Sequence, residues 1–156
     1  LKGRSESEYA PQTNITRAEY LYFLVRTLGV EARVDGNFDD IDKNAYYYKE
    51  IGIAKKLGIT TGTGNNKFDP DASITRQDMM VLTARTMQKF KALKAADDIT
   101  VLGKFSDKGD IANYAAISLA TLVKENLITG SGDRINPHAY TTRAEAAVFL
   151  YRIYNK

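Results

Sequence analysis

The stretch that decides the fold of this chain is ITRAE at residues 15–19. It returns as ITRQD at 74–78 and as TTRAE at 141–145. A threonine followed three residues later by an acid, ahead of an apolar-periodic segment, is the pattern of a capping box at the start of a helix. A proline precedes each motif arginine by six residues, and another arginine follows it by nine. The chain is therefore a tandem repeat whose helices begin at equivalent places in each copy.

Two of the copies extend further upstream than the third. FDD at 38–40 and FSD at 105–107 each open a segment that ends in LGI or NLI before a glycine-bearing loop, and the first copy has no such half. The sequence predicts four parts, namely the second half of a first repeat (1–36), a full second repeat (37–90), a connection (91–103) and a full third repeat (104–156).

Hydrophobic periodicity predicts a downstream helix in each repeat and an upstream helix in each full one. The downstream helices are expected at 16–28, 75–90 and 142–154, and the upstream helices at 44–57 and 111–125. The loops carry Gly, Asn, Asp, Ser and Pro, which is turn chemistry rather than strand chemistry. The predicted fold class is all-α, built from paired helices.

One apolar face is predicted for each downstream helix from the i, i+3, i+4 spacing. The expected core residues are Leu21, Tyr22, Val25 and Leu28 in the first helix, Met80, Val81, Ala84 and Met87 in the second, and Ala147, Val148, Tyr151 and Tyr154 in the third.

Composition excludes several classes of protein. The net charge of +3 is not gathered into a basic run, which argues against nucleic-acid binding. No cysteine is present for disulfides or thiolate metal sites, and no apolar run approaches the roughly 20 residues of a membrane span. No signal peptide opens the chain, so we expect a processed or excised segment if the protein is exported.

The motif arginines Arg17, Arg76 and Arg143 need a separate explanation. A cation in the first turn faces the positive end of the helix dipole, which typically costs a few tenths to about 1 kcal/mol. A helix N-terminus with available amides binds anions, and a guanidinium adds a bidentate donor for a carboxylate or phosphate. The partner is either a ligand or an acid from a neighbouring repeat, chiefly Asp40 or Asp107. The arginines nine residues further on are interpreted as structural.

The order FxD, aromatic, helix, GI, glycine loop, FxP and ITRAE resembles the bacterial S-layer homology domain. FDD…LGITTG…FDPDASITRQD and FSD…LITG…INPHAYTTRAE carry the resemblance, which covers the chain except for the 91–103 connection. The resemblance implies a pseudo-threefold spindle of repeats, here with an incomplete first repeat. It also implies a non-catalytic anchor that holds a larger surface protein on secondary cell-wall polysaccharide, outside the cell and without membrane insertion or cofactors.

The glycan epitope implied by the resemblance is a pyruvate ketal on N-acetylmannosamine, bound in grooves between repeats. The ketal carboxylate would meet the motif arginines, the acids of the FxD motifs would accept from sugar hydroxyls, and the loop glycines would let backbone amides approach the sugar. The implied ligand-binding residues are Arg17, Arg76, Arg143, Asp40, Asp107, Gly62, Gly130, Tyr47 and Tyr114.

The sequence departs from the family pattern in three ways that matter. It has no tryptophan, so Tyr47 and Tyr114 are expected either to offer a face to the pyranose ring or to pack in the core. Asp78 replaces a glutamate of the capping box, and we expect the cap to tolerate this change. The groove that needs the absent upstream half would be incomplete, at Arg143 or Arg17.

Catalysis finds little support in the sequence. The single histidine, His138, has no nucleophile patterned around it, the acid pairs lie in turns and caps, and no metal-binding pattern is present. A sugar-cleaving enzyme is therefore a poor fit. The remaining alternative is a helical-repeat module for protein–protein interaction in the cell envelope, with AYYYKEI at 45–51 as a candidate surface.

Overall fold

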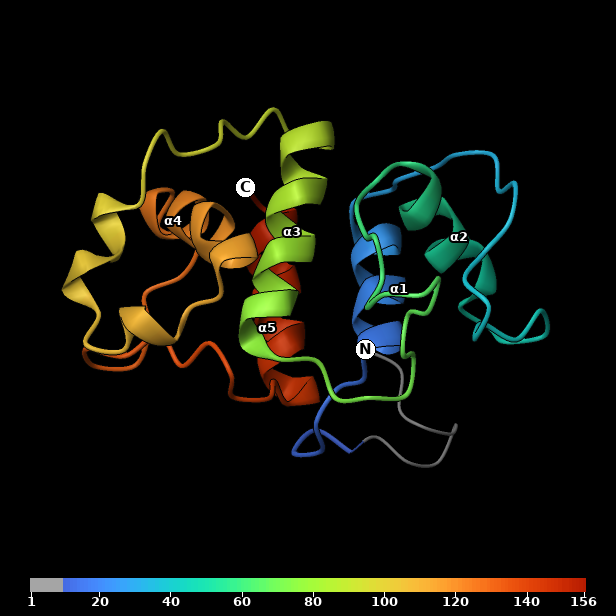
Figure 1. The fold of residues 1–156 in the computed structure, drawn as a ribbon, viewed down its shortest axis with the longest axis horizontal. Coiled ribbons are helices and arrows are strands. Elements are labelled where there is room, and N and C mark those ends of the chain that lie inside the picture. Colours follow the sequence, from blue (N-terminus) through green and yellow to red (C-terminus); the bar gives the residue numbers. More distant parts are fainter. Residues whose placement is uncertain (1–9) are drawn as a thin grey trace. The chain divides into compact units, whose positions relative to one another are not determined.

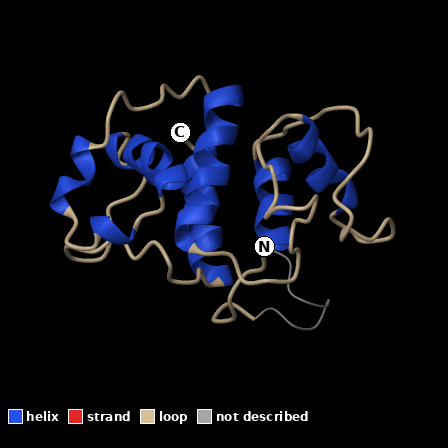
Figure 2. Ribbon diagram, in the orientation of Figure 1, coloured by secondary structure: helices blue, strands red, loops and turns tan. Residues whose placement is uncertain are grey.

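A computed structural model describes residues 10–156, and these residues form helices joined by loops, without a β-sheet (Figure 2). Two counterparts in the first repeat lie outside the described residues, namely Gly3, a further candidate loop glycine, and Tyr9, which precedes its proline by two residues as Phe68 and Ile135 precede theirs. The helices are α1 (Arg17–Thr27), α2 (Tyr48–Lys56), α3 (Arg76–Phe90), α4 (Ala116–Lys124) and α5 (Arg143–Tyr154), with 3₁₀ turns η1 (Thr100–Lys104), η2 (Lys108–Asp110) and η3 (Asn113–Ala115). The all-α prediction is confirmed over this range.

The chain divides into two compact units that do not follow the sequence repeats. Unit 1 comprises the chain up to Ile74 together with Thr141–Lys156, and unit 2 is Thr75–Tyr140. Each unit combines the downstream helix of one repeat with the upstream helix of the next. A repeat is thus a unit of sequence, whereas a core is built from halves of neighbouring repeats.

In unit 1 the first downstream helix packs against two others. α2 lies beside α1 (Figure 1), and α5 also contacts α1. Leu21 and Leu24 of α1 and Ile51 of α2 are fully buried. Outside this core, Arg26 of α1 forms an ion pair with Glu50 of α2 at 3.5 Å. Burial of these aliphatic side chains, at about 25 cal/mol per Å², is the main stabilising term for such short helices.

In unit 2 the helix α3 packs against α4 and η3, and α4 also contacts η1 (Figure 1). Met80 and Met87 of α3 and Leu119 of α4 are fully buried. The predicted connection 91–103 is not a plain linker, because it contains most of η1 and buries Leu93 and Leu102. Hydrophobic periodicity missed η1 because a five-residue 3₁₀ turn is too short to show the i, i+3, i+4, i+7 spacing that identifies a helix.

The three threonine caps are confirmed. In α1 and α5 the N-cap hydroxyl accepts from the amide of the glutamate at N3, and that glutamate accepts from the N-cap amide. In α3 only the first of these bonds forms, from the Asp78 amide to the Thr75 hydroxyl. The expectation that Asp78 would complete the box is wrong, because its side chain is one methylene shorter. The Asp78 carboxylate instead accepts from the Tyr114 hydroxyl at 2.5 Å.

The residues just before the three caps meet in a closed ring of backbone hydrogen bonds in unit 1. The amide of Ile15 donates to Thr141, that of Ile74 to Ile15, and that of Thr141 to Ile74, at 2.9, 3.1 and 3.4 Å. All three residues are fully buried. One residue of each repeat thus takes an equivalent place around a common centre. We refer to Ile15, Ile74 and Thr141 together as the hub, which joins the three repeats.

Some details of the helix predictions are wrong. The upstream helices expected at 44–57 and 111–125 begin later, at Tyr48 and Ala116, because the residues before them form turns. The predicted apolar face of α5 is rotated, since its buried residues are Ala146, Phe149, Leu150 and Ile153. The predicted faces hold for α3, whose four residues are all buried, and for Leu21 and Val25 of α1.

Candidate functional site

The first amides of the three downstream helices are already occupied by the protein. The loop before each motif arginine contains the proline of that repeat, and we call it the proline loop. The N1 amides of Arg17, Arg76 and Arg143 each donate at 2.8 Å to a carbonyl in the proline loop of another repeat. The next amide in each helix donates to the carbonyl of that loop's proline, at 2.9–3.0 Å. With the N3 amide bonded to the capping hydroxyl, the positive end of each helix is satisfied internally. The expectation of available amides at these N-termini is therefore wrong.

The side chain of Arg17 continues this connection between repeats. Its Nε donates to the carbonyl of Phe68 at 2.9 Å, and its guanidinium lies 4.8 Å from the centre of the Phe68 ring. Arg17 is only 8% exposed. A planar guanidinium suits this site because it can donate in its plane and stack on an aromatic ring at the same time.

Arg76 and Arg143 occupy the equivalent positions in α3 and α5. In unit 2, the Nε of Arg76 donates to the carbonyl of Ile135 at 3.4 Å, and the residue keeps part of its surface exposed. In unit 1, Arg143 is 1% exposed and its Nη1 forms an ion pair with the carboxylate of Glu19. An acid of a neighbouring repeat was one of the two predicted kinds of partner, and for Arg143 that acid is Glu19 rather than Asp40 or Asp107.

Asp40 and Asp107 act as clasps for the proline loops. The amides of Phe68 and Asp69 donate to the two carboxylate oxygens of Asp40, each at 2.8 Å. The amides of Ile135 and Asn136 donate to Asp107 at 2.9 and 2.8 Å. Burial raises the pKa of both carboxyl groups, but these backbone hydrogen bonds outweigh it and hold each pKa below its ordinary value.

These clasps predict a loss of stability in acid. A carboxyl group whose pKa is lowered by folding stabilises the protein fully above its unfolded-state pKa of about 3.9, and this contribution disappears as the pH falls through the lower folded-state pKa. We expect the free energy of unfolding to decline below about pH 4, and to decline less steeply in the double variant Asp40→Asn/Asp107→Asn. Urea titrations between pH 7 and pH 2 measure this. Parallel acid limbs in the two proteins would contradict the clasp role.

The structure of the loop requires a glycine at the same place in both full repeats. Gly62 and Gly130 have φ values of 80° and 78°. A Cβ on Gly62 would lie 2.2 Å from the Lys67 carbonyl oxygen, and one on Gly130 would lie 2.7 Å from that of Arg134. Each glycine thus allows its loop to fold tightly against its own backbone. Approach of a sugar to these loops stays a prediction.

The two tyrosines lie at comparable places but differ in environment. Tyr114 is 58% exposed, and its hydroxyl bonds to Asp78 near the start of α3. Tyr47 precedes α2 and is half-buried, with its ring 5.1 Å from that of Tyr46. Burial raises the pKa of Tyr47, and the nearby carboxylates, of which Asp71 has the largest effect, raise it further. Neither ring is enclosed in the core.

The structure brings Tyr114 and Arg76 to the same end of α3. Tyr114 bonds to the residue at N3, Arg76 is at N1, and the Gln77 side chain between them accepts from the amide of Ala112 at 3.0 Å. Sequence reasoning missed Glu19, Gln77 and Asp78 as residues that join repeats. The available signal was their position directly after the motif arginines, and for Glu19 and Asp78 capping already gave a sufficient explanation.

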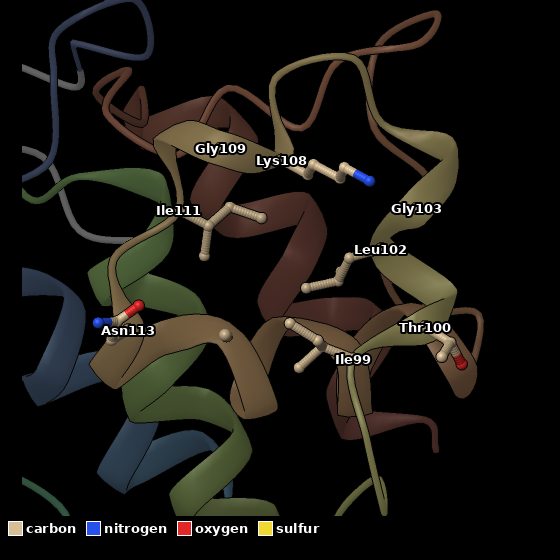
Figure 3. Close-up of a pocket in the computed structure, with 9 residues that line it drawn as sticks. Ile99, Thr100, Leu102, Gly103, Lys108, Gly109, Ile111 and Asn113 are labelled. Atoms are coloured by element: carbon tan, nitrogen blue, oxygen red, sulfur yellow. The ribbon is translucent and has the colours of Figure 1, made fainter.

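A separate cavity of about 570 Å³ lies in unit 2, between the 3₁₀ turns and α4 (Figure 3). Its walls are mostly apolar, with Ile111 facing Leu102 and Ile99 across the space, and Lys108 at its edge. None of the predicted ligand-binding residues lines it. In the part of the chain from residue 10 onward there is no group of acids and histidine arranged to hold a metal ion. No helix within that range is long and apolar enough to cross a bilayer.

The match to a known family follows the repeats. The model of the S-layer homology domain matches residues 37–80 and 104–147, which together make up more than half of the chain. Each match begins just before an FxD segment and ends within a downstream helix. The chain belongs to the S-layer homology family, and this membership places it at the bacterial cell surface, in association with the wall.

The proteins that are similar to this chain include enzymes as well as structural proteins of the cell surface. The chain is 29% identical over its whole length to an exoglucanase, XynX, of Acetivibrio thermocellus, and covers 14% of it. Over 97% of its length it is 28% identical to a surface-layer 125 kDa protein of Lysinibacillus sphaericus and 27% identical to a cellulosome-anchoring protein of A. thermocellus, of which it covers 13% and 34%. The chain thus spans between 13% and 34% of the length of these relatives.

Proposed function

We propose that this chain is a non-catalytic module that anchors a larger surface protein to the cell wall. The observation that carries the proposal is the set of proteins that share the segment. A surface-layer protein, a cellulosome-anchoring protein and an exoglucanase have no reaction in common. A segment common to all three serves what they share, which is attachment at the cell surface.

The proposed ligand is pyruvylated secondary cell-wall polysaccharide. A pyruvate ketal carries a carboxylate, which a guanidinium can bind through two parallel hydrogen bonds. An exposed tyrosine ring beside it offers an apolar face to a pyranose. The net charge of +3 further favours an anionic polymer over a neutral one.

We assign the main binding position to the start of α3, at Arg76 and Tyr114. Arg76 retains exposed surface and has the longer of the two Nε bonds to a proline-loop carbonyl, 3.4 Å against 2.9 Å for Arg17. Arg17 with Tyr47 is the secondary position, because its guanidinium is stacked on Phe68 and is more buried. Arg143 is assigned to the fold, since it is 1% exposed and paired with Glu19.

Co-sedimentation with isolated walls tests the anchor proposal. We expect the chain to sediment with walls stripped of protein, and to remain in solution when the secondary polysaccharide has been extracted from them. Retention on extracted walls would indicate another ligand, and binding that depends on wall proteins would favour the interaction module. Release of reducing ends from the polysaccharide would contradict the non-catalytic assignment.

A further inference from the structure

The outward side of α5 carries a row of large apolar side chains exposed to solvent. Val148, Tyr151 and Tyr154 are 60%, 73% and 60% exposed. They lie five, eight and eleven residues after Arg143, a spacing that puts them on one face of the helix. Single exposed apolar residues are common, but a contiguous row indicates an interaction surface. We refer to these three residues as the α5 outer face.

The equivalent positions in the other two downstream helices are covered. The residues at the middle of the row, eight after the motif arginine, are Val25 in α1 and Ala84 in α3, and they are 2% and 0% exposed. Five after the arginine, Val81 of α3 is 4% exposed where Val148 of α5 is 60% exposed. The same face of a repeated helix is therefore buried in α3, partly buried in α1, where Tyr22 and Leu28 are half-buried, and exposed in α5.

What covers the equivalent face is an upstream helix in each case. α2 packs on α1 and α4 packs on α3. On α1, the Tyr22 ring makes an edge contact with Tyr46, just before α2, at 4.9 Å between ring centres. The next turn of α1 places Arg26 opposite Glu50 of α2. The covering element is thus a nine-residue amphipathic helix, preceded by an aromatic residue and carrying an acid in its first turn.

We propose that the α5 outer face is the docking surface for a partner helix of the α2 type, supplied from outside the described residues. The repeat symmetry of the fold indicates which side chains of a partner helix would fit this face. Apolar side chains such as Ile51 and Ala54 of α2 would cover Val148 and Tyr151, and an acid at the position of Glu50 would face Arg152, which takes the place of Arg26. The inference goes beyond wall attachment and does not rest on it.

A peptide with the sequence of residues 37–58 provides the probe, because it contains the whole of α2 and the aromatic residues before it. The chain has no tryptophan, so Tyr151→Trp places a single indole on the α5 outer face. We expect the peptide to produce a saturable blue shift of its emission. A nine-residue helix is marginally stable on its own, so its affinity will be in the high micromolar to millimolar range.

Matched variants make the test specific. Val148→Lys in the tryptophan reporter should weaken binding at least tenfold, and the peptide carrying Ile51→Asp should not bind. Ile117→Lys is the control, because it makes the same kind of change at an exposed position of α4, 41% exposed, outside the face. Circular dichroism should show that both lysine variants fold like the parent, since neither site is buried.

Two outcomes would overturn the proposal. An emission maximum that does not move with the peptide, or that moves equally in the Val148→Lys and Ile117→Lys proteins, would show that the face does not take such a helix. Self-association of the chain without peptide, abolished by Val148→Lys in sedimentation velocity experiments, would show that a second copy covers the face instead of a partner helix.

Discussion

Replacement of Arg143 with alanine is expected to lower the free energy of unfolding by about 3–5 kcal/mol, the range for breaking a buried ion pair from one side. Arg143 is 1% exposed, and the side chain of its partner Glu19 is 16% exposed. Alanine would leave the Glu19 carboxylate without its cation and open a void beside the hub of Ile15, Ile74 and Thr141. Chemical denaturation of the two proteins at neutral pH measures the difference.

Two further variants separate charge from volume in this prediction. Arg143→Met/Glu19→Gln removes both charges but fills the space, and should recover part of the loss, since an apolar replacement of a buried pair is often close to neutral. Arg33→Ala is the control, because this side chain is 94% exposed. It should show no measurable change. A loss in Arg143→Ala as small as that in Arg33→Ala would contradict the structural role assigned to Arg143.

Replacement of Gly62 with alanine is expected to cost about 2–5 kcal/mol through two separate effects. The left-handed backbone, φ 80°, costs a side-chain-bearing residue about 1–2 kcal/mol. The added Cβ would lie 2.2 Å from the Lys67 carbonyl oxygen and 2.8 Å from the Phe38 ring, and such overpacking costs about 1–3 kcal/mol. The backbone oxygen cannot move aside without disrupting the loop. Thermal or chemical denaturation gives the value.

The chain offers a matched control for this glycine. Gly58 has a similar φ of 73°, but a Cβ there would meet nothing within 4 Å. Gly58→Ala should therefore show only the backbone part of the cost, about 1–2 kcal/mol. Equal losses at Gly58 and Gly62 would mean that the loop relaxes around the new methyl group, and that the close packing against Lys67 and Phe38 is not what requires glycine.

The repeat pattern predicted the parts of the fold that depend on local sequence. The three caps, the five helices and the all-α class follow from threonine–acid spacing and apolar periodicity, which are read over a few neighbouring residues. The missing half of the Asp78 cap depended on a single methylene. The 3₁₀ turn η1 and the late start of α2 were missed because short turns carry no periodic signal.

The pairing of halves from different repeats could not be read from the sequence. Arg143 and Glu19 are 124 positions apart, and each has a sufficient local explanation as part of a helix start. For the same reason the expectation that the first amides of these helices are available to an anion was wrong, because the carbonyls that accept from them come from another repeat. The rotated face of α5 shows the reverse case, since Val148 and Tyr151 are apolar and periodic, yet exposed.

The role of the nine residues named from the family resemblance in ligand binding stays a prediction. The three motif arginines bond to a neighbouring repeat, whereas the acids and the loop glycines lie against their own repeat. Asp40, Asp107, Gly62 and Gly130 have roles in the loops that would be needed without any ligand. Arg76, which keeps part of its surface exposed, is the motif arginine that we propose as the partner of a ligand carboxylate.

Calorimetric titration with a wall-derived saccharide, with and without its pyruvate ketal, shows whether Arg76 binds the carboxylate of a wall glycan. We expect ketal-dependent binding that Arg76→Ala weakens by about 10- to 100-fold, the range for one charge-assisted hydrogen-bonding group. Arg134→Ala, which removes an exposed charge from the same unit, should leave the binding unchanged. Equal binding of both saccharides, or an affinity unaffected by Arg76→Ala, would contradict the account.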